Sequence, residues 1–383
     1  MLVRFYSPHK GGNEHQCQLL SEYLTANNYN VIIITERYSL KLLKNEIING
    51  VKIIRLNSLN TYLDINKVKP NSFFKKLFRF GFYYAAEYSL MINIFFFIRL
   101  RKSKNSILHI HQNNWIAFWG IIGVNGRIPV VTKDATLNGF NELKLMPFSA
   151  FMQKSIIKKS HFIAVSTDIK TNLLNYSINE KRIHFIPNSV VLPTETNQYR
   201  NLTDFLFVGN FDQGKIKGLD ILIEAFLSVS KSFNSIRLVI IGKGDPNLYK
   251  MILSTDHNHS NCILFLGPQC DVSKYYKSSF VFVLPSRSEG MSNSLLEAMS
   301  FGIPCISTMV SGSKDLIINN ENGLLVPVDS TKALEDAIAF MYTNPLKAAE
   351  MGINGRKTIE KKFSSTIVYP QYPNLYKKIT NDY

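Results

Sequence analysis

Two glutamates eight positions apart, Glu289 and Glu297, stand in the run PSRSEGMSNSLLEAMSFGIP at 285–304. Paired carboxylates can act as acid and base, or they can accept hydrogen bonds from vicinal hydroxyls, as at ribose sites. No evident neighbour in this run would raise the pKa of either carboxyl group, which disfavours an acid and base pair. We therefore expect both glutamates to bind hydroxyl groups.

The residues around the two glutamates predict a strand, a loop and a helix. FVFVL at 280–284 is typical of a buried parallel strand. Ser292 and Asn293 are natural N-caps for a helix over 294–301, which Gly302 ends. This arrangement places free helix N–H groups at the carboxyl end of the strand, where open α/β sheets bind ligands.

The rest of the chain alternates strand and helix patterns in two series. Candidate strands of the first series are 2–7, 31–35, 51–56, 107–111, 129–132, 161–166 and 183–187. After the polar stretch 193–201 a second series begins, with candidate strands at 205–210, 237–245, 262–267, 280–284, 304–308 and 324–329. The alternation predicts two doubly wound, Rossmann-like α/β domains, 1–192 and 193–365, that face each other across a ligand cleft.

The composition describes a folded, strongly basic protein of 383 residues with a net charge of +16. This charge implies an anionic partner, which could be nucleic acid, an acidic membrane surface or a phosphorylated substrate. The four cysteines match no metal-ligand spacing, so we expect no metal site. The chain starts without a secretory pattern and has no sufficiently long apolar run, so we expect a cytoplasmic protein.

Three glycine-rich turns follow candidate strands. Gly11 and Gly12 open the first helix, where backbone amides can approach a phosphate, although a tight turn explains them equally well. Lys215 and Lys217 lie in a second such turn, and Gly244 lies in the third, GKGD. A lysine in such a turn can neutralise a phosphate. A solvated lysine is the alternative for Lys215, whereas Lys217 beside a helix start is the better candidate.

Taken together, these segments resemble the family-4 glycosyltransferases of the GT-B fold. The resemblance rests on the ordered set FVGN…KG, IIGKGD, FLGP…YYKSS, PSRSEGMSNSLLEAM and SGSKDLIINNENGLLVPVD in the second half, and on the GG turn, HIH and AVSTDIKTNL…IPNSV in the first. It implies a retaining, metal-independent enzyme that uses a nucleotide sugar and needs no cofactor. In relatives the chain end crosses back, which implies the same for 366–383.

The resemblance also implies roles for particular residues. Glu289 would contact the hydroxyls of the donor sugar, Glu297 the ribose, and Lys217 the diphosphate, whose developing charge must be stabilised. Asn210 stands where the family usually has an arginine, so we expect Lys215 or another base to assist. The implied donor-binding residues are Gly11, Gly12, Asn210, Lys215, Lys217, Gly244, Glu289, Gly290, Met291, Ser292 and Glu297. Glu289, Lys217 and His111 are the catalytic candidates.

The first half supplies candidates for the acceptor side. His109 and His111 are two apart in ILHIH, so their side chains point to the same face of a strand. His111 is nearer the carboxyl end and could reach a ligand, although an ordinary packed histidine is the alternative. Lys133 and Asp134 follow the candidate strand PVVT and join His109 as acceptor-side candidates.

The segment NSFFKKLFRFGFYY at 71–84 interleaves aromatic rings with Lys75, Lys76 and Arg79. The mixture is typical of an interfacial segment, and we expect 71–104 to contact an anionic membrane surface. A buried helix with basic edges is the alternative. Base-stacking platforms use similar residues, but no nucleic-acid motif is present, so we expect no nucleic acid partner.

We therefore expect transfer, with retention, of a sugar from a nucleotide diphosphate sugar, with a UDP-sugar favoured. The acceptor would be a hydroxyl of a glycan or lipid-linked molecule in cell-surface polysaccharide or glycoconjugate synthesis, at the inner face of the membrane. A GT-B nucleotide-sugar epimerase is the alternative. A nicotinamide-dependent oxidoreductase is disfavoured, because G-x-G-x-x-G and its ribose-binding acid are missing. A nonenzymatic basic binding protein would leave both glutamates without a role.

Overall fold

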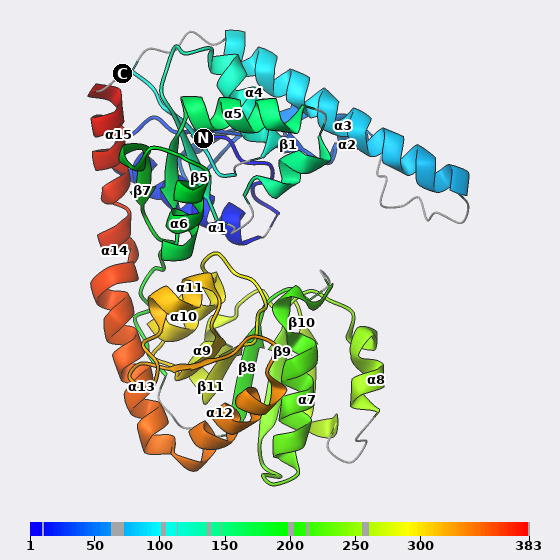
Figure 1. The fold of residues 1–383 in the computed structure, drawn as a ribbon, viewed down its shortest axis with the longest axis vertical. Coiled ribbons are helices and arrows are strands. Elements are labelled where there is room, and N and C mark those ends of the chain that lie inside the picture. Colours follow the sequence, from blue (N-terminus) through cyan, green and yellow to red (C-terminus); the bar gives the residue numbers. More distant parts are fainter. Residues whose placement is uncertain are drawn as a thin grey trace. The chain divides into compact units, whose positions relative to one another are not determined.

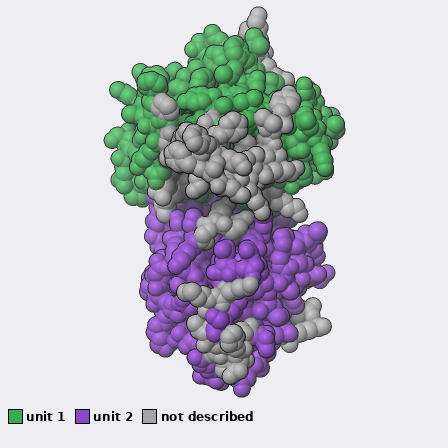
Figure 2. Space-filling view, turned by 90° about the vertical axis from the view of Figure 1, so that its right-hand side faces the viewer, with its two compact units in different colours: residues 1–165, 169–186, 369–383 green, residues 166–168, 187–368 purple. Residues whose placement is uncertain are grey.

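The computed structural model describes residues 1–9, 11–62, 73–100, 105–112, 114–135, 139–146, 148–197, 203–211, 214–254 and 260–381. The chain forms two compact units (Figure 2). Unit 1 comprises 1–165, 169–186 and 369–383, and unit 2 comprises 166–168 and 187–368. Each unit is a mixed α/β structure built on parallel strands, as the alternating patterns predict (Figure 1).

The sheet of unit 1 has two parts that the first residues of the chain join. The order β1-β3-β2 covers Ile32–Arg37, Val51–Asn57 and Asn45–Ile48, and the order β4-β5-β6-β7 covers Leu108–Ile110, Val130–Asp134, His161–Ala164 and Ile183–Phe185. Leu2 forms parallel bridges to both Ile34 and Ile110. The strand expected over 2–7 is therefore much shorter than predicted, because ladder hydrogen bonds to β1 end at Arg4, whose carbonyl accepts from Glu36.

The helices of unit 1 pack around this sheet. They are α1 (Gly12–Ala26), α2 (Leu59–Tyr62), α3 (Phe73–Leu100), α4 (Trp115–Val124), α5 (Ser149–Lys159), α6 (Thr167–Asn175) and α15 (Gln371–Asn381), with short 3-10 turns η2 (Asn141–Leu145) and η3 (Glu180–Arg182). Helix α4, WIAFWGIIGV, is apolar around most of its circumference, so it lies buried and packs against both α3 and α5 (Figure 1). Gly123 permits the close approach, because a Cβ there would lie 3.1 Å from Cβ of Ile98.

Unit 2 has a six-stranded parallel sheet in the order β10-β9-β8-β11-β12-β13. These strands are Ile263–Gly267, Arg237–Ile241, Asp204–Val208, Val281–Leu284, Cys305–Thr308 and Leu324–Val326. In chain order within the unit this is 3-2-1-4-5-6, the doubly wound dinucleotide-binding order. Its topological switch point, where ligands bind in such sheets, lies between β8 and β11.

The helical elements of unit 2 follow its strands. They are η4 (Gly214–Lys217), α7 (Leu219–Ser230), η5 (Pro246–Tyr249), α8 (Lys250–Leu253), η6 (Ser260–Cys262), α9 (Ser273–Ser278), α10 (Asn293–Ser300), α11 (Ser311–Leu316), α12 (Thr331–Thr343), α13 (Pro345–Thr358), η7 (Ile359–Phe363) and α14 (Ser365–Val368). The core beneath α7 is aromatic: the ring of Phe205 lies 5.5 Å from that of Phe226 and 5.9 Å from that of Phe280. This rigid core supports the strand ends that carry the candidate site.

Part of the proposed interfacial segment lies outside the described residues. This applies to 71–72 and 101–104, and to the side chains of Lys75, Lys76 and Arg79 within α3. None of the helices in the described part of the chain, α3 included, has the combination of length and hydropathy needed to cross a bilayer.

Candidate functional site

The switch point of unit 2 brings together Lys217 and Glu289. Lys217 ends the turn η4 after β8, and Glu289 lies in the loop between β11 and α10. Their Nζ and Oε1 atoms are 2.6 Å apart, and Ser286 Oγ donates to the same carboxylate oxygen at 2.8 Å. Glu289 and Lys217 are each partly exposed, so the pair can be reached by a ligand. The two residues predicted to act on one donor are therefore neighbours.

Gly218 allows the Lys217 turn to approach the end of β11. Its φ of +64° lies in the left-handed region, and a Cβ at this position would lie 1.9 Å from the carbonyl oxygen of Pro285. A side chain would therefore push the loop away from Pro285. The glycine beside Lys217, noted in the sequence as a helix start, also determines how close the lysine comes to Glu289.

Arg287 ties the two loops together. Its guanidinium forms two hydrogen bonds to Asp220 at the start of α7, at 2.7 and 3.0 Å, and a third to Asp329 at 2.6 Å. It also donates to the carbonyl of Lys215, and its backbone N–H donates to the carbonyl of Ile216 at 2.8 Å. Burial by itself would raise the pKa of Asp220, but the contacts with Arg287 and hydrogen bonds from the backbone at the start of α7 together hold this pKa below its ordinary value. The contacts fix η4 relative to the loop that carries Glu289.

The other predicted donor residues after β8 and β9 have more modest roles. The Lys215 side chain is 82% exposed and its Nζ lies 3.7 Å from Asp220 Oδ2. Asn210 Oδ1 accepts from the Lys243 backbone N–H at 3.0 Å, which joins the loops after β8 and β9. Gly244 is packed against Phe211, because a Cβ there would lie 2.1 Å from Cδ2 of that ring. Asn210 thus organises the loop rather than presenting a positive charge.

The loop before α10 is buried and closely packed. Ser292 caps the helix by accepting a hydrogen bond from the Leu295 N–H at 3.4 Å, and the helix starts at Asn293, one residue earlier than predicted. Gly290 and Met291 are buried, and a Cβ on Gly312 would lie 2.5 Å from the carbonyl oxygen of Gly290. The predicted residues 290–292 are therefore closely packed directly before the N-terminus of α10, whose dipole favours a negative group.

Glu297 lies in the second turn of α10 and has a different partner from Glu289. Tyr276 of α9 donates its hydroxyl to Oε2 of Glu297 at 3.0 Å, and the Tyr276 ring stacks on Phe301 at 5.4 Å. Burial raises the pKa of Glu297, and the Tyr276 hydrogen bond opposes this rise only in part. The expectation that nothing raises the pKa of either glutamate is therefore wrong for Glu297. The packing of α9 on this side could not be predicted from the run itself.

In unit 1 the two histidines of β4 stack on each other. The rings of His109 and His111 are 4.4 Å apart, and His109 Nδ1 lies 2.7 Å from the hydroxyl of Tyr376 in α15. Both side chains are buried, and within the described residues neither Nε2 atom has a hydrogen-bond partner. Burial, together with the nearby positive charge of Lys133, lowers the pKa of both imidazoles well below the ordinary value. Both rings are therefore neutral at physiological pH.

Lys133 and Asp134 end the neighbouring strand β5 and are also buried. Burial lowers the pKa of Lys133 from 10.5 to about 8. A buried lysine with a lowered pKa can exist as a neutral amine near physiological pH, which makes it a candidate for proton transfer. The structure thus places His111 and Lys133 near the carboxyl ends of the adjacent strands β4 and β5, with His109 in the middle of β4.

Gly11 and Gly12 form the start of α1, as predicted from the sequence. Gly11 is the extended N-cap, and a Cβ there would lie 2.3 Å from Oε2 of Glu14, which bends back over the first turn. The Glu14 carboxylate therefore lies beside the glycine turn, in the space where a phosphate was expected. Helix α1 itself is well formed, with a buried face that includes Cys17 and Leu20.

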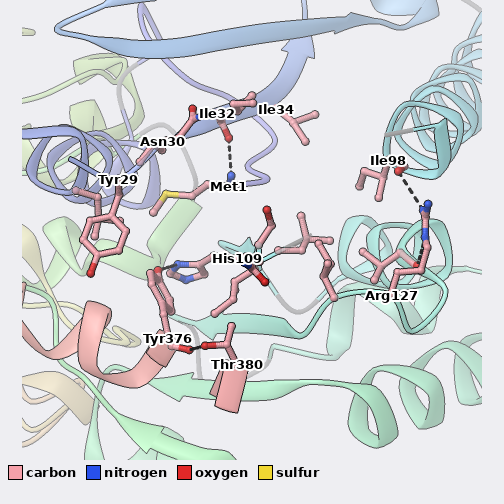
Figure 3. Close-up of a pocket in the computed structure, with 18 of the residues that line it drawn as sticks. Met1, Tyr29, Asn30, Ile32, Ile34, Ile98, His109, Arg127, Tyr376 and Thr380 are labelled. Carbon is pink, nitrogen blue, oxygen red and sulfur yellow. Dashed lines mark hydrogen bonds between the residues drawn. The ribbon is translucent and has the colours of Figure 1, made fainter. Parts of the chain in front are cut away.

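A cavity of about 630 Å³ lies at the opposite, amino-terminal edge of the unit 1 sheet (Figure 3). Its walls include Ile32 and Leu108, which begin β1 and β4, and Tyr376 and Thr380 of α15. His109 also contributes to the lining. The cavity is thus separate from the strand ends that carry His111 and Asp134. Within the described parts of both units, no three His, Cys, Asp or Glu side chains are grouped as a metal ion would require.

Ser286, Arg287 and Tyr276 were not singled out from the sequence, although Ser286 and Tyr276 donate to the two glutamates and Arg287 holds the turn that carries the lysines. Ser286 and Arg287 belong to the run PSRSEG itself, and Tyr276 belongs to YYKSS. Both segments are among those that carried the resemblance. Their residue types gave no indication of their partners. Those partners are set by which strands are neighbours in the sheet.

Models of known protein families match both halves of the chain. Residues 10–192 match the family described as Glycosyltransferase Family 4, and residues 203–344 match Glycosyl transferases group 1. N-acetyl-alpha-D-glucosaminyl L-malate synthase of Bacillus anthracis is 24% identical over 83% of this chain and 87% of its own. Phosphatidyl-myo-inositol mannosyltransferase of Mycobacterium leprae is 25% identical over 71% of this chain and 73% of its own.

Solved structures show the same fold. The Anabaena protein Alr3699/HepE, solved in complex with UDP-glucose, superposes with a TM-score of 0.74 at 15% identity, covering 98% of this chain and 99% of its own. Its similarity, together with the doubly wound sheets described above, establishes the architecture of two Rossmann-like domains. The chain is a family-4 glycosyltransferase of the GT-B fold.

Proposed function

We propose that this enzyme transfers a sugar from a nucleotide diphosphate sugar to an acceptor hydroxyl with retention of configuration, and that it needs no metal. The observation that carries the proposal is the Lys217–Glu289 pair at the switch point of unit 2, 2.6 Å apart and open to a ligand. A positive group for the diphosphate and a carboxylate for sugar hydroxyls stand side by side there.

Donor binding would exchange the partners of this pair. The diphosphate takes the place of the carboxylate at Lys217, and Glu289 becomes free to accept hydrogen bonds from the sugar, while Ser286 keeps its carboxylate oriented. As the bond to the sugar breaks, negative charge grows on the leaving diphosphate. Lys217 and the N-terminal dipole of α10 stabilise this charge, which is the main catalytic task without a metal.

Glu297 would hold the ribose of the donor. An ionised carboxylate accepts hydrogen bonds from two vicinal hydroxyls, and Tyr276 fixes its orientation through Oε2. The raised pKa of Glu297 means that its charge needs this hydrogen bond. Glu289 and Glu297 therefore have separate tasks, with catalysis depending more on Glu289 and nucleotide affinity more on Glu297.

For unit 1 we propose the acceptor side. His111, Lys133 and Asp134 end the adjacent strands β4 and β5, at the sheet edge where α/β units bind ligands. Retention is proposed to follow from departure and attack on the same face of the sugar, with the leaving phosphate taking the acceptor proton.

A UDP-sugar is the favoured donor, since a protein of the same fold has been solved with UDP-glucose. The two relatives differ in acceptor: one is named for L-malate and the other for phosphatidyl-myo-inositol. We propose a glycan or lipid-linked acceptor in cell-surface polysaccharide or glycoconjugate synthesis, used at the inner face of the cell membrane.

Thermal stabilisation by nucleotide sugars tests the donor directly. UDP-, GDP- and ADP-sugars are added separately with and without a chelator, and one of them should raise the melting temperature, because a ligand that binds only the folded state stabilises it. The chelator should leave that shift unchanged. No shift with any of them would overturn the donor assignment.

Product analysis separates transfer from the alternative reactions. Incubation of the protein with the donor alone should yield no epimer, whereas an epimerase would form one without an acceptor. With an acceptor, the anomeric coupling constant measured by NMR should match that of the donor sugar. An inverted product would contradict the retaining mechanism and leave the fold assignment intact.

A further inference from the structure

Asn188 is a buried residue of the segment IPNSV, to which the proposed chemistry gives no role. It follows β7 and is one of the first residues of unit 2. Its side-chain amide donates two hydrogen bonds, to the carbonyl oxygen of Met291 and to Oδ1 of Asn293, both at 3.2 Å. These acceptors stand on either side of Ser292, the N-cap of α10. Asn188 therefore holds the loop between Glu289 and α10.

The backbone beside Asn188 is fixed by a second segment of unit 2. The Val190 N–H donates to the carbonyl of Phe363 at 3.1 Å, and the Ser365 N–H donates to the carbonyl of Val190 at 2.9 Å. The Asn188 side chain thus extends from a backbone that has its own partners. Because a carbonyl oxygen accepts but cannot donate, the Met291 contact requires that Nδ2 of Asn188 faces the loop.

The other oxygen of this side chain is left without a partner. Oδ1 of Asn188 is buried, and within the described residues it forms no hydrogen bond. A buried polar atom without a partner costs free energy, so an asparagine is not the residue that stability alone would favour here. The two hydrogen bonds that its Nδ2 donates to the donor loop are therefore the better explanation for an asparagine at this position.

The same loop is packed against the backbone of α11. A Cβ on Gly312 would lie 2.5 Å from the carbonyl oxygen of Gly290 and 2.5 Å from Cα of Met291, so only a glycine allows this approach. Within the described part of the chain, the backbone N–H groups of Met291 and Ser292 have no hydrogen-bond partner. The loop thus has fixed carbonyl groups and N–H groups that remain available.

The geometry of the peptide group links these two facts. The Met291 carbonyl and the Ser292 N–H belong to one planar trans peptide unit, in which they point in opposite directions. Because Asn188 holds the carbonyl, the Ser292 N–H is directed away from Asn188. This N–H lies at the N-terminus of α10, where the helix dipole favours a negative group. An N–H group with a fixed direction is a preorganised donor to a phosphate.

We infer that Asn188 is a positioning residue for donor binding, which holds the Met291 carbonyl so that the Ser292 N–H donates to the diphosphate of the donor. The inference rests on the proposed function, because it takes the ligand beside Lys217 and α10 to be a nucleotide diphosphate sugar. Asn188 itself touches no substrate. Its effect passes through one peptide unit, so it should concern the phosphates and not the nucleoside.

Calorimetry with UDP and with uridine tests this on the full-length protein. N188A should weaken UDP binding by about tenfold, because the peptide unit at 291–292 is no longer held in its productive orientation. The affinity for uridine, which carries no phosphate, should be unchanged. A residue that only supported the fold would not distinguish between these two ligands.

N188D separates the hydrogen bonds of Asn188 from its packing. Aspartate has nearly the same size, but its ionised carboxylate cannot donate to the Met291 carbonyl. At neutral pH, N188D should bind UDP at least as weakly as N188A. As the pH falls the carboxyl group gains a proton and can donate one hydrogen bond. The UDP affinity of N188D relative to the unchanged protein should then rise, whereas that of N188A should stay constant.

N322A is the matched control. Asn322 is also a buried asparagine of unit 2, and its Nδ2 donates to the carbonyl of Leu316 and to Oγ1 of Thr358, both at 3.1 Å. It lies before β13, away from the loop that precedes α10. Its replacement should lower the melting temperature, as N188A does, and leave the affinity for UDP unchanged.

G312A displaces the same loop by a different route and serves if N188A does not fold. A methyl group on Gly312 would push Gly290 and Met291 away from α11, so UDP binding should weaken and uridine binding should not.

Equal UDP affinity of folded N188A and the unchanged protein would overturn the inference. An equal loss of affinity for UDP and uridine would do the same, because the effect would then not involve the phosphates. If the unchanged protein bound no UDP, the favoured donor would be wrong and the inference would fail with it.

Discussion

Lys217 and Glu289, 72 positions apart in the sequence, are joined by an ion pair of 2.6 Å between the loops that follow β8 and β11. These strands flank the switch point of the unit 2 sheet. In the proposed mechanism this pair holds both groups in place before the donor binds, and the diphosphate then replaces the carboxylate at Lys217. Catalytic groups that are already oriented avoid a reorganisation cost during the reaction.

Replacing Lys217 by methionine should lower kcat/KM by about 100-fold, because one fixed positive group no longer stabilises the leaving diphosphate. UDP affinity measured by calorimetry should fall as well. K215M is the matched control, since Lys215 lies two residues earlier and its side chain is 82% exposed. Its kcat/KM should change by less than about fivefold. Equal losses in both variants would mean that the turn acts through its net charge alone.

Replacing Arg287 by lysine should lower kcat/KM by about tenfold and destabilise the protein by about 1–2 kcal/mol. A single ammonium group cannot reproduce the paired hydrogen bonds to Asp220 together with the contact to Asp329. The loop carrying Glu289 would then be less well fixed relative to Lys217. Steady-state kinetics and urea unfolding measure the two effects.

R237K is the control for this substitution. Arg237 forms a similar two-bond contact with Asp204, at 2.6 and 2.8 Å, but it lies at the amino-terminal end of β9 and its side chain is 51% exposed. We expect unchanged kinetics and a small change in unfolding free energy. A loss of activity in R237K comparable to that in R287K would show that Arg287 has no positional role.

Replacing Tyr276 by phenylalanine should weaken UDP binding about tenfold at neutral pH. It should also raise the pH below which UDP binding is lost. Burial raises the pKa of Glu297, so the folded protein loses the ionised carboxylate at a higher pH than an unfolded chain does. The Tyr276 hydroxyl favours the charged form, and its removal raises that pKa further. Calorimetric titrations with UDP across acid to neutral pH measure the shift.

Y275F is the neighbouring control for Tyr276. The Tyr275 hydroxyl donates to Gln269 at 3.2 Å rather than to Glu297, so its loss should leave UDP binding and the pH profile unchanged. A pH profile of Y276F that coincides with that of the unchanged protein would contradict the role assigned to Tyr276 in keeping Glu297 ionised.

Replacing Lys133 by methionine should stabilise the protein near pH 7 by about 3 kcal/mol. Burial lowers the pKa of Lys133 to about 8, below its value of 10.5 in an unfolded chain. The folded state then holds fewer protons than the unfolded state between these two values, so stability rises with pH across that window. The advantage of K133M should therefore be greatest below about pH 8 and disappear near pH 10.5.

Urea unfolding at several pH values measures this difference, with K158M, at an exposed position, as the control. A stabilised K133M that transfers sugar poorly would indicate that the buried amine is retained for function. If K133M were less stable than the unchanged protein at pH 7, the ammonium group would have to be well paired in the folded state.

Much of unit 2 could be predicted from its sequence, because its signals are local. Apolar runs predicted the strands, and Ser292 with Gly302 predicted α10 to within one residue. In unit 1 the strand expected over 2–7 was the main error, since it forms only bridges at Leu2. A run of suitable residues does not show how far a ladder continues, because this depends on the neighbours β1 and β4.

The amino-acid sequence by itself determined the alternation of strands and helices, the positive charge, and the positions of Glu289, Glu297 and Lys217 at strand ends. Only the tertiary structure decided their partners. The strand order placed β8 beside β11 and so joined Lys217 to Glu289, while the packing of α9 brought Tyr276 to Glu297. Periodicity and capping act over a few residues, whereas contacts between distant loops depend on the order of strands in the sheet.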